Sequence, residues 1–298
     1  MTNIDIMITG SSRPQLIPYC VDAIKRFITS QSKTINYKWY LHEDSIFPEL
    51  SKQTVEYAKS TGIFEKIILT EPAEGLGLSI DRMIREHITA PFMLYVQEDF
   101  EFNRTGIDMD RIIWTMNNHK SINYIIFNKR NNRKVSKTFI PEECDFDGMK
   151  LTLWNACNMI PSLWRMDKCR EKWRVRVNIP EGYWINSWGN QDQRNDVAWL
   201  KNNMGCYLYG GYNEYAYAEH IGNTWRMEEW RMIDGKPGGN LGFEVLKDQY
   251  KIPWLKSEKR PINKDLKFDK KDLENEGFKK AWDNLSDNAK KELDHGFK

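Results

Sequence analysis

The stretch PFMLYVQED, residues 91–99, decides the fold. Residues 91–96 carry no charge and are long enough for one buried strand, and they run directly into Gln97, Glu98 and Asp99. A buried strand with this ending places two carboxylates at one edge of a sheet.

Strand and helix patterns alternate between the N-terminus and this stretch. The apolar spacing predicts strands at residues 4–9, 37–41 and 66–69, and helices at residues 16–28, 49–60 and from 79 to 86. Such alternation predicts right-handed crossovers and a mostly parallel sheet. Ligands bind beyond the carboxyl ends of the strands in such sheets. We therefore expect the loops at 10–14, 42–44 and 97–99 to converge on one site.

The second half of the chain is less regular. We expect a helix at 108–119, a strand at 124–128, a Lys/Arg/Asn-rich loop at 129–137 and strands around Gly210. The sequence becomes highly charged from about residue 255, which predicts a peripheral helical tail. The predicted class is α/β, with a Rossmann-like mixed, mostly parallel sheet flanked by helices. The predicted domain spans 1–250, with halves 1–102 and 103–250, and the tail spans 251–298.

Composition restricts the class of protein. The 44 Lys and Arg against 42 Asp and Glu leave a net charge of +2, which argues against a protein that coats nucleic acid by charge alone. No apolar run approaches the roughly 20 residues of a membrane span, and the first residues lack a signal-peptide pattern. The five cysteines form no CxxC pair, which argues against a disulfide scaffold or a zinc ribbon and favours a cytoplasmic location.

The Glu98-Asp99 pair suits a divalent cation, because hard ions prefer carboxylate oxygens. Such an ion could offset the charge of a diphosphate leaving group. Acidic pairs also occur in solvated turns at strand ends, so the spacing alone leaves both interpretations open.

Three segments resemble glycosyltransferases of the GT-A fold, in particular the family 2-like group. ITGSSRP at 8–14 resembles their opening strand and loop, GLGLSIDR at 75–82 the start of their third helix, and PFMLYVQEDFEF at 91–102 the strand that leads to their acidic metal motif. The likeness covers residues 4–102 well and is patchier from 150 to 225, where NMIPSLWR at 158–165 is similar to their acceptor-side segment.

The resemblance implies a metal-dependent transfer of a sugar from a nucleoside diphosphate, most simply UDP, with Mn2+ or Mg2+. Asp99 would bind the metal, but the motif here is Gln-Glu-Asp instead of the more acidic Asp-x-Asp. The residues that would contact the nucleotide sugar are Thr9, Ser11, Arg13, Glu43, Asp44, Asp81, Arg82 and Glu98.

His220 is similar to the second protein ligand of many such enzymes, and imidazole suits Mn2+ better than Mg2+. A packed, hydrogen-bonded histidine is the equal alternative. An inverting reaction needs a general base, which in such enzymes lies at a helix start. The resemblance implies Asp192, and next Asp196, for this role. A carboxylate that only caps a helix is the alternative for both.

The acceptor side is predicted from aromatic residues and one arginine: Trp154, Trp164, Arg165 and Trp188. Core packing is the competing interpretation for each tryptophan. The expected acceptor is a glycan. A modified base in viral DNA is the alternative, because residues 129–137 are basic and tryptophans can stack on bases.

Two other functions fit parts of the sequence. A nucleotidyltransferase on a related sheet would carry a glycine-rich loop after the first strand, whereas GSSRP at 10–14 has one glycine. A non-catalytic protein that binds carbohydrate or nucleic acid would not need Glu98 and Asp99.

Overall fold

The computed structural model describes residues 2–45, 48–127, 139, 141–173, 188–211 and 216–221. The chain divides into two compact units, Met1–Glu219 and His220–Lys298. The predicted basic loop at 129–137 and the charged tail lie outside the described residues.

The first unit alternates strands and helices through its N-terminal half. Its strands are β1 Thr2–Gly10, β2 Ile35–Asp44, β3 Phe64–Thr70, β4 Phe92–Gln97, β5 Phe100–Phe102, β6 Tyr124–Ile126, β7 Glu143–Phe146, β8 Met149–Leu153, β9 Ser162–Arg165 and β10 Cys206–Tyr209, and β11 is Ala218–His220. Its helices are α1 Ile17–Phe27, η1 Thr29–Gln31, α2 Pro48–Thr61, α3 Leu76–Glu86, α4 Met109–Asn118, α5 Met166–Lys172, α7 Gln191–Asn195, α8 Val197–Trp199 and η2 Leu200–Met204.

The large sheet has nine strands in the order β3-β2-β1-β4-β9-β6-β10-β8-β7, and β11 pairs with β5 in a second sheet. The three pairings within β3-β2-β1-β4 are all parallel. β9 runs antiparallel between β4 and β6, and the β7–β8 hairpin closes the far edge. The predicted mixed α/β sheet is confirmed. Its N-terminal strands pair in parallel, and β6 and β10 form a further parallel pair.

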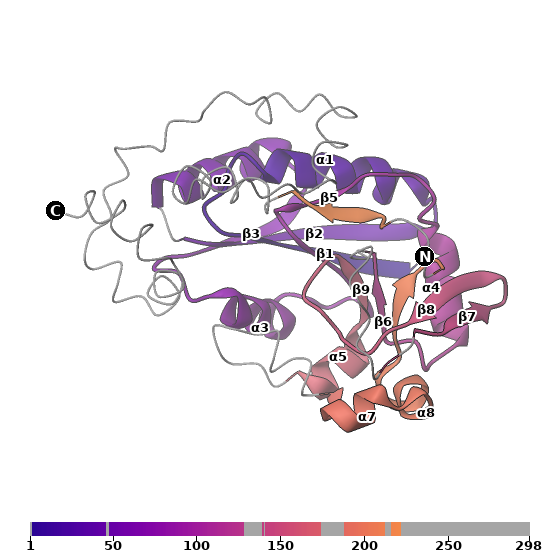
Figure 1. Ribbon diagram of the computed structural model, residues 1–298. Coiled ribbons are helices and arrows are strands. Elements are labelled where there is room, and N and C mark those ends of the chain that lie inside the picture. Colours follow the sequence, from indigo (N-terminus) through magenta and orange to yellow (C-terminus); the bar gives the residue numbers. More distant parts are fainter. Residues whose placement is uncertain are drawn as a thin grey trace, which may run out of the picture. The chain divides into compact units, whose positions relative to one another are not determined.

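Strand order explains where the helices lie. The chain steps from β1 to β2 to β3 in one direction and then returns past β2 and β1 to β4. Right-handed crossovers in opposite directions put helices on opposite faces. Figure 1 shows this arrangement, with α1 and α2 on one face of the sheet and α3 on the other.

Parallel strands covered on both faces should be apolar on both sides. Residues 4–10 of β1 are all buried, and in β4 only Gln97 is not fully buried. Asp5 is a buried charged residue of β1, and its Oδ2 accepts hydrogen bonds from the backbone N–H groups of Thr89 and Ala90 at 2.7 and 2.8 Å. This contact ties the start of β4 to β1.

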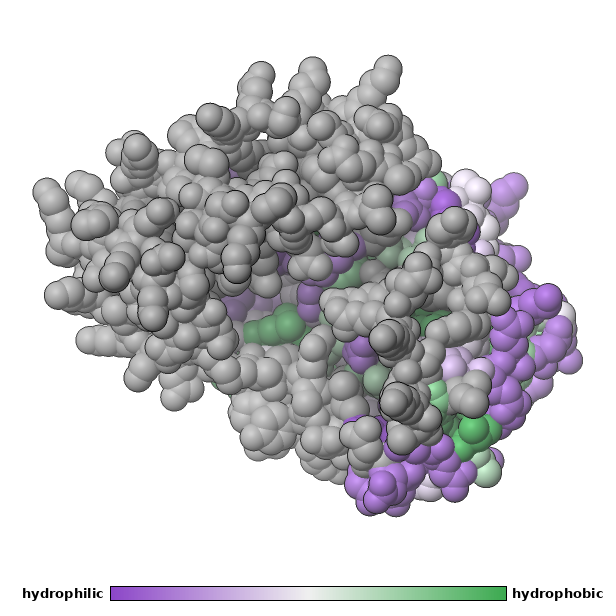
Figure 2. Space-filling model, in the orientation of Figure 1, coloured by the Kyte–Doolittle hydropathy of each residue, from purple (hydrophilic) through white to green (hydrophobic). Residues whose placement is uncertain are grey.

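The first unit has a polar surface around the β7–β8 hairpin, α7 and α8. On the face in Figure 2, hydrophilic side chains gather over the β7–β8 hairpin and over α7 and α8. None of the described helices is both long enough and apolar enough to cross a bilayer. All five cysteines are free thiols.

Candidate active site

The ends of β1, β2 and β4 lie together because the strands are in parallel register. Thr9 pairs with Gln97 of β4, and Gly10 pairs with Glu43 of β2. The residues after these positions therefore leave the sheet at the same edge. The predicted convergence of the three loops is confirmed.

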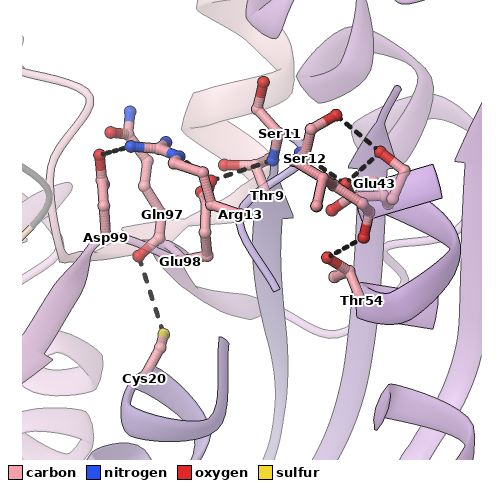
Figure 3. A network of polar contacts seen from close by, with 12 residues as sticks. Thr9, Ser11, Ser12, Arg13, Cys20, Glu43, Thr54, Gln97, Glu98 and Asp99 are labelled. Atoms are coloured by element: carbon pink, nitrogen blue, oxygen red, sulfur yellow. Dashed lines mark hydrogen bonds and ion pairs between the residues drawn. The ribbon is translucent and has the colours of Figure 1, made fainter. Parts of the chain in front are cut away.

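Arg13 connects the loop after β1 to the carboxylates after β4. Its Nε donates to Glu98 Oε1 at 2.7 Å, and its Nη1 donates to Asp99 Oδ2 at 2.6 Å. The Arg13 side chain is 11% exposed and each carboxylate side chain 3% exposed. Figure 3 shows the guanidinium group in front of both carboxylates. One cation and two acidic groups thus form a nearly buried cluster.

The backbone of the loop is fixed by the same carboxylates. The N–H of Ser11 donates to Glu98 Oε1 at 3.0 Å, and the N–H of Ser12 donates to Glu43 Oε1 at 2.6 Å. Ser12 adopts a left-handed backbone conformation, with φ 55°. The N–H of Glu98 in turn donates to the carbonyl of Thr9 at 2.9 Å. The loop is therefore held in one conformation by acceptors from two neighbouring strands.

Burial changes the proton affinities of these groups. Burial raises the pKa of Glu98 to about 7, and Asp99 adds to the rise while Arg13 opposes it. Burial opposes the charge on Arg13, but Asp99 and Glu98 outweigh it and raise the pKa of Arg13. Burial also raises the pKa of Glu43 to about 8. Arg13 therefore carries a permanent positive charge at this edge of the sheet.

A second group of polar contacts surrounds Asp44 at the end of β2. Its carboxylate accepts the backbone N–H groups of Glu74 and Gly75 at 2.7 and 2.8 Å. Glu74 accepts two hydrogen bonds from Arg82, at 3.0 and 2.6 Å, and lies 3.4 Å from the buried His42. Burial lowers the pKa of His42, so this side chain is neutral near pH 7. Asp44 thus fixes the start of α3, and the Arg82 side chain is 41% exposed. Its role toward a nucleotide stays a prediction.

The other predicted nucleotide contacts are also engaged within the protein. Asp81 accepts from Arg85 at 2.7 Å and from the indole N–H of Trp173 at 2.9 Å. The hydroxyl of Thr9 lies 3.2 Å from the Tyr95 hydroxyl and is almost fully buried. Their roles toward a nucleotide stay predictions.

A divalent cation would need the carboxylates that Arg13 now holds. The first position of the acidic motif is Gln97, whose amide donates to the Tyr95 hydroxyl at 3.1 Å and to the carbonyl of Met159 at 2.9 Å. Within the described part of the chain, no group of three His, Cys, Asp or Glu side chains could hold a metal ion. Mg2+ needs only one or two protein carboxylates when substrate phosphates supply other ligands. Asp99 and Glu98 fit a cation of this kind once Arg13 leaves them.

His220 begins the second unit of the chain. Its predicted role as a metal ligand stays a prediction.

The two candidate bases lie on short helices near the surface. Asp192 is exposed in the first turn of α7, which Asn190 caps. Asp196 caps α8, and its Oδ1 accepts from the N–H groups of Ala198 and Trp199 at 2.8 and 3.1 Å. The capping role given as the alternative is therefore present at Asp196, and a catalytic role for either residue stays a prediction.

The predicted acceptor residues include two that lie in the sheet. Trp164 has no exposed surface and packs against Tyr95 and Tyr124 with ring centroids 5.4 and 5.1 Å away. Arg165 is 6% exposed, and its guanidinium donates to the carbonyls of Ile122 and Met116. Core packing, the competing interpretation for the tryptophans, describes Trp164 because β9 is an internal strand. The role of Arg165 toward an acceptor stays a prediction.

Trp188 is also buried, at 4% exposed, whereas Trp154 is partly exposed and contacts Phe139 edge to face at 6.3 Å. Of the four residues, Trp154 keeps the most surface for an acceptor.

Three further residues around Arg13, Glu98, Asp99 and Glu43 were not predicted from the sequence. The hydroxyl of Ser51 in α2 donates to Glu43 Oε1 at 2.7 Å and lies 2.8 Å from the Ser12 hydroxyl. The Cys20 thiol donates to the carbonyl of Gln97 at 3.7 Å, and Glu101 of β5 is 6% exposed nearby. A polar residue on the buried face of a helix after β2 was the available signal for Ser51. Nothing in the spacing distinguished Cys20 from an ordinary core cysteine.

No protein-family model and no curated protein matches this sequence. Among solved structures, the fold is similar to Staphylococcus aureus TarS 1-349 in complex with UDP, at 10% identity and a TM-score of 0.48 over 73% of this chain. The alignment spans 60% of that structure's length.

Two further structures are similar over most of the chain. The mannosyltransferase PcManGT from Pyrobaculum calidifontis, in complex with GDP-Man and Mn2+, is 9% identical, with a TM-score of 0.45 over 98% of this chain and 79% of that one. GalNAc-T7 with UDP, GalNAc and Mn2+ is 9% identical, with a TM-score of 0.45 over 87% of this chain and 56% of that one. At this distance the function has to be argued from the residues of the chain itself.

Proposed function

We propose that this chain is a glycosyltransferase that takes a sugar from a nucleoside diphosphate, with UDP the first candidate. The observation that carries the proposal is the contact of Arg13 with Glu98 and Asp99 at the carboxyl ends of the parallel strands. Ligands bind at this edge in open α/β sheets. The resemblance of residues 8–14, 75–82 and 91–102 to the GT-A group agrees with this location.

The residues at this edge suit the chemistry of a diphosphate leaving group. Negative charge builds up on the diphosphate as the sugar departs, and a fixed positive group beside it lowers the barrier. Arg13 is such a group, because its planar guanidinium matches phosphate geometry. A divalent cation held by Asp99 and Glu98, Mn2+ or Mg2+, would offset the same charge when bound. Arg82 binds Glu74 next to the start of α3, which Asp44 fixes, and is the candidate contact for the nucleoside or its phosphates.

The acceptor is proposed to be a hydroxyl group on a glycan. Asp192 is the first candidate for the base that removes its proton, and Trp154 the first candidate for stacking on a sugar ring. A hydroxymethylated base in DNA is the second candidate acceptor, and weak, salt-insensitive binding of oligonucleotides would remove it. A hexose and a pentose are both compatible with the residues named.

The test is a panel of UDP- and GDP-sugars, with and without Mn2+, read out as thermal stabilisation and as release of the nucleotide. We expect one nucleotide sugar to stabilise the protein and to be hydrolysed slowly. The Asp99→Asn variant should lose most of this turnover, by a factor of about 100 or more. The matched control is Asp22→Asn, which removes an exposed carboxylate from α1 and should change nothing.

The alternatives give different products. A nucleotidyltransferase would join a nucleoside triphosphate to a sugar phosphate and release pyrophosphate. A binding protein would be stabilised by a sugar nucleotide or an oligonucleotide without any turnover. Failure of every nucleotide sugar to bind, in either metal condition, would exclude the glycosyltransferase.

A further inference from the structure

Arg13 holds both carboxylates that a divalent cation would use. Its two contacts, at 2.7 Å to Glu98 and 2.6 Å to Asp99, are as short as charge-assisted hydrogen bonds become. Both acids are 2% exposed, so little of either remains open to solvent. A cation that approaches from water meets a guanidinium group already in place.

The neighbouring positions do not offer a replacement for these ligands. Gln97 stands where a further acid of the motif would be, and its amide nitrogen is committed to Tyr95 and Met159. Glu43 lies on the other side of the loop and accepts from Ser12 and Ser51. Neither Gln97 nor Glu43 is therefore placed to replace Glu98 and Asp99 as a ligand of a metal ion.

We propose that Arg13 competes with the divalent cation for Glu98 and Asp99, and that the diphosphate of the donor relieves this competition by drawing Arg13 to itself. The proposal rests on the proposed function, since it assumes a nucleotide diphosphate as the ligand. It predicts an order of events: the protein alone has little affinity for the metal, and nucleotide and metal bind cooperatively.

The chemistry of Arg13 supports an exchange of partners. The hydrogen bonds from Arg13 to the two carboxylates use Nε and Nη1. Nη2 is not used in these two contacts, so the guanidinium group can bind a phosphate oxygen before it releases a carboxylate. Arginine binds phosphate and carboxylate with the same two-pronged geometry. The residue also lies at the end of the loop, directly before Pro14, while Ser11 and Ser12 keep the loop backbone fixed. A change of side-chain conformation is therefore enough to move the charge.

The test measures Mn2+ binding to the full chain by calorimetry, without nucleotide, for the wild type and for Arg13→Gln. We expect Arg13→Gln to bind Mn2+ more tightly by about tenfold or more, because the competing charge and two charge-assisted hydrogen bonds are gone. Arg26→Gln is the matched control: it removes an exposed arginine from α1 and should leave Mn2+ affinity unchanged. Arg13→Lys keeps the charge but loses the planar guanidinium group. Its affinity for Mn2+ should lie between those of the wild type and Arg13→Gln.

The second arm repeats the titrations with saturating UDP. Coupling between two ligands is reciprocal, so it can be measured from the metal side alone. UDP chelates Mn2+ by itself, and both proteins should therefore gain some affinity. The gain should be larger in the wild type, because only there does UDP also remove Arg13 from the carboxylates.

Each outcome decides the proposal. Equal Mn2+ affinity of wild type and Arg13→Gln overturns it, as does the absence of Mn2+ binding from both. If Arg13→Gln does not fold, as judged by circular dichroism, Arg13→Lys provides the same comparison. If UDP binds the wild type but shows no greater coupling than in the variant, the proposal fails while the proposed function stands. If no nucleotide binds at all, the proposed function fails, whatever the metal affinities are.

Discussion

Glu43 provides the strongest test of the geometry around the site. It is fully buried at the end of β2, and its Oε1 accepts from the N–H of Ser12 and the hydroxyl of Ser51. Its Oε2 has no hydrogen-bond partner among the described residues. Burial raises its pKa from the ordinary value of 4.5 to about 8, and the charge of Glu98 adds to the rise, whereas the two hydrogen bonds and Arg13 oppose it. Glu43 is therefore protonated in the folded protein at neutral pH.

The size of the effect follows from proton linkage. The unfolded chain loses the Glu43 proton near pH 4.5 and the folded protein near pH 8. The stability from the neutral carboxyl is therefore fully present below pH 4.5 and is lost as the pH rises to 8. The gap corresponds to roughly 5 kcal/mol. This is an upper value, because the loop can move and admit water once the group ionises.

The perturbation is Glu43→Gln, which keeps the shape of the side chain and its acceptor but never ionises. We expect the variant to be within about 1 kcal/mol of the wild type at pH 5. At pH 8 to 9 it should be more stable than the wild type by about 2 to 5 kcal/mol. The measurement is urea unfolding of both proteins at five pH values between 5 and 9. The comparison uses the difference between the two free energies of unfolding at each pH, because the contributions of the other titrating groups cancel in that difference.

Glu56→Gln is the control, because Glu56 is an exposed glutamate on α2. Its difference from the wild type should not change with pH. A flat difference for Glu43→Gln as well would refute the argument that burial dominates at this position. A difference of opposite sign would show that Glu43 is ionised and stabilised by the charge of Arg13.

Two further substitutions test the packing of the same region. Gly10→Ala should destabilise the protein by about 1 to 3 kcal/mol in urea unfolding, since its Cβ would lie 2.2 Å from Glu43 Oε2; an unchanged midpoint would mean that this side chain moves freely. Arg165→Met should lower stability by about 1 to 3 kcal/mol per carbonyl left without its donor, and should leave the KM for the acceptor unchanged. A raised acceptor KM with normal stability would instead place Arg165 in the acceptor site.

The N-terminal half of the fold could be predicted from local sequence. β1, β2 and β4 are apolar runs that end in polar residues, and α1 keeps its apolar residues at helical spacing. Each predicted element from residue 4 to residue 97 is present, with ends that differ by a few residues. Because the crossovers between parallel strands are right-handed, the carboxyl ends of β1, β2 and β4 could be predicted to lie at one edge of the sheet.

The second half could not be predicted in the same way. β9 has only four residues, and its neighbours are β4, more than 60 residues earlier, and β6. Such pairings depend on contacts between distant segments, which leave no period in the sequence. The β7–β8 hairpin turns at Asp147-Gly148, a turn signal that the prediction did not use. Trp164 was assigned to the acceptor because a tryptophan on an internal strand and one on a surface have the same local pattern.

The contact of Arg13 with Glu98 and Asp99 follows only in part from the sequence. Register places these three residues at one edge, and that much follows from the alternation of strands and helices. The sequence does not decide which positive charge binds the two acids, because a guanidinium group and a divalent cation both bind carboxylate oxygens. The acidic motif alone is therefore compatible with a metal site and with an arginine counterion. The two differ in one measurable property: a counterion that belongs to the chain lowers the affinity of the acids for a free ion, and its removal must raise that affinity.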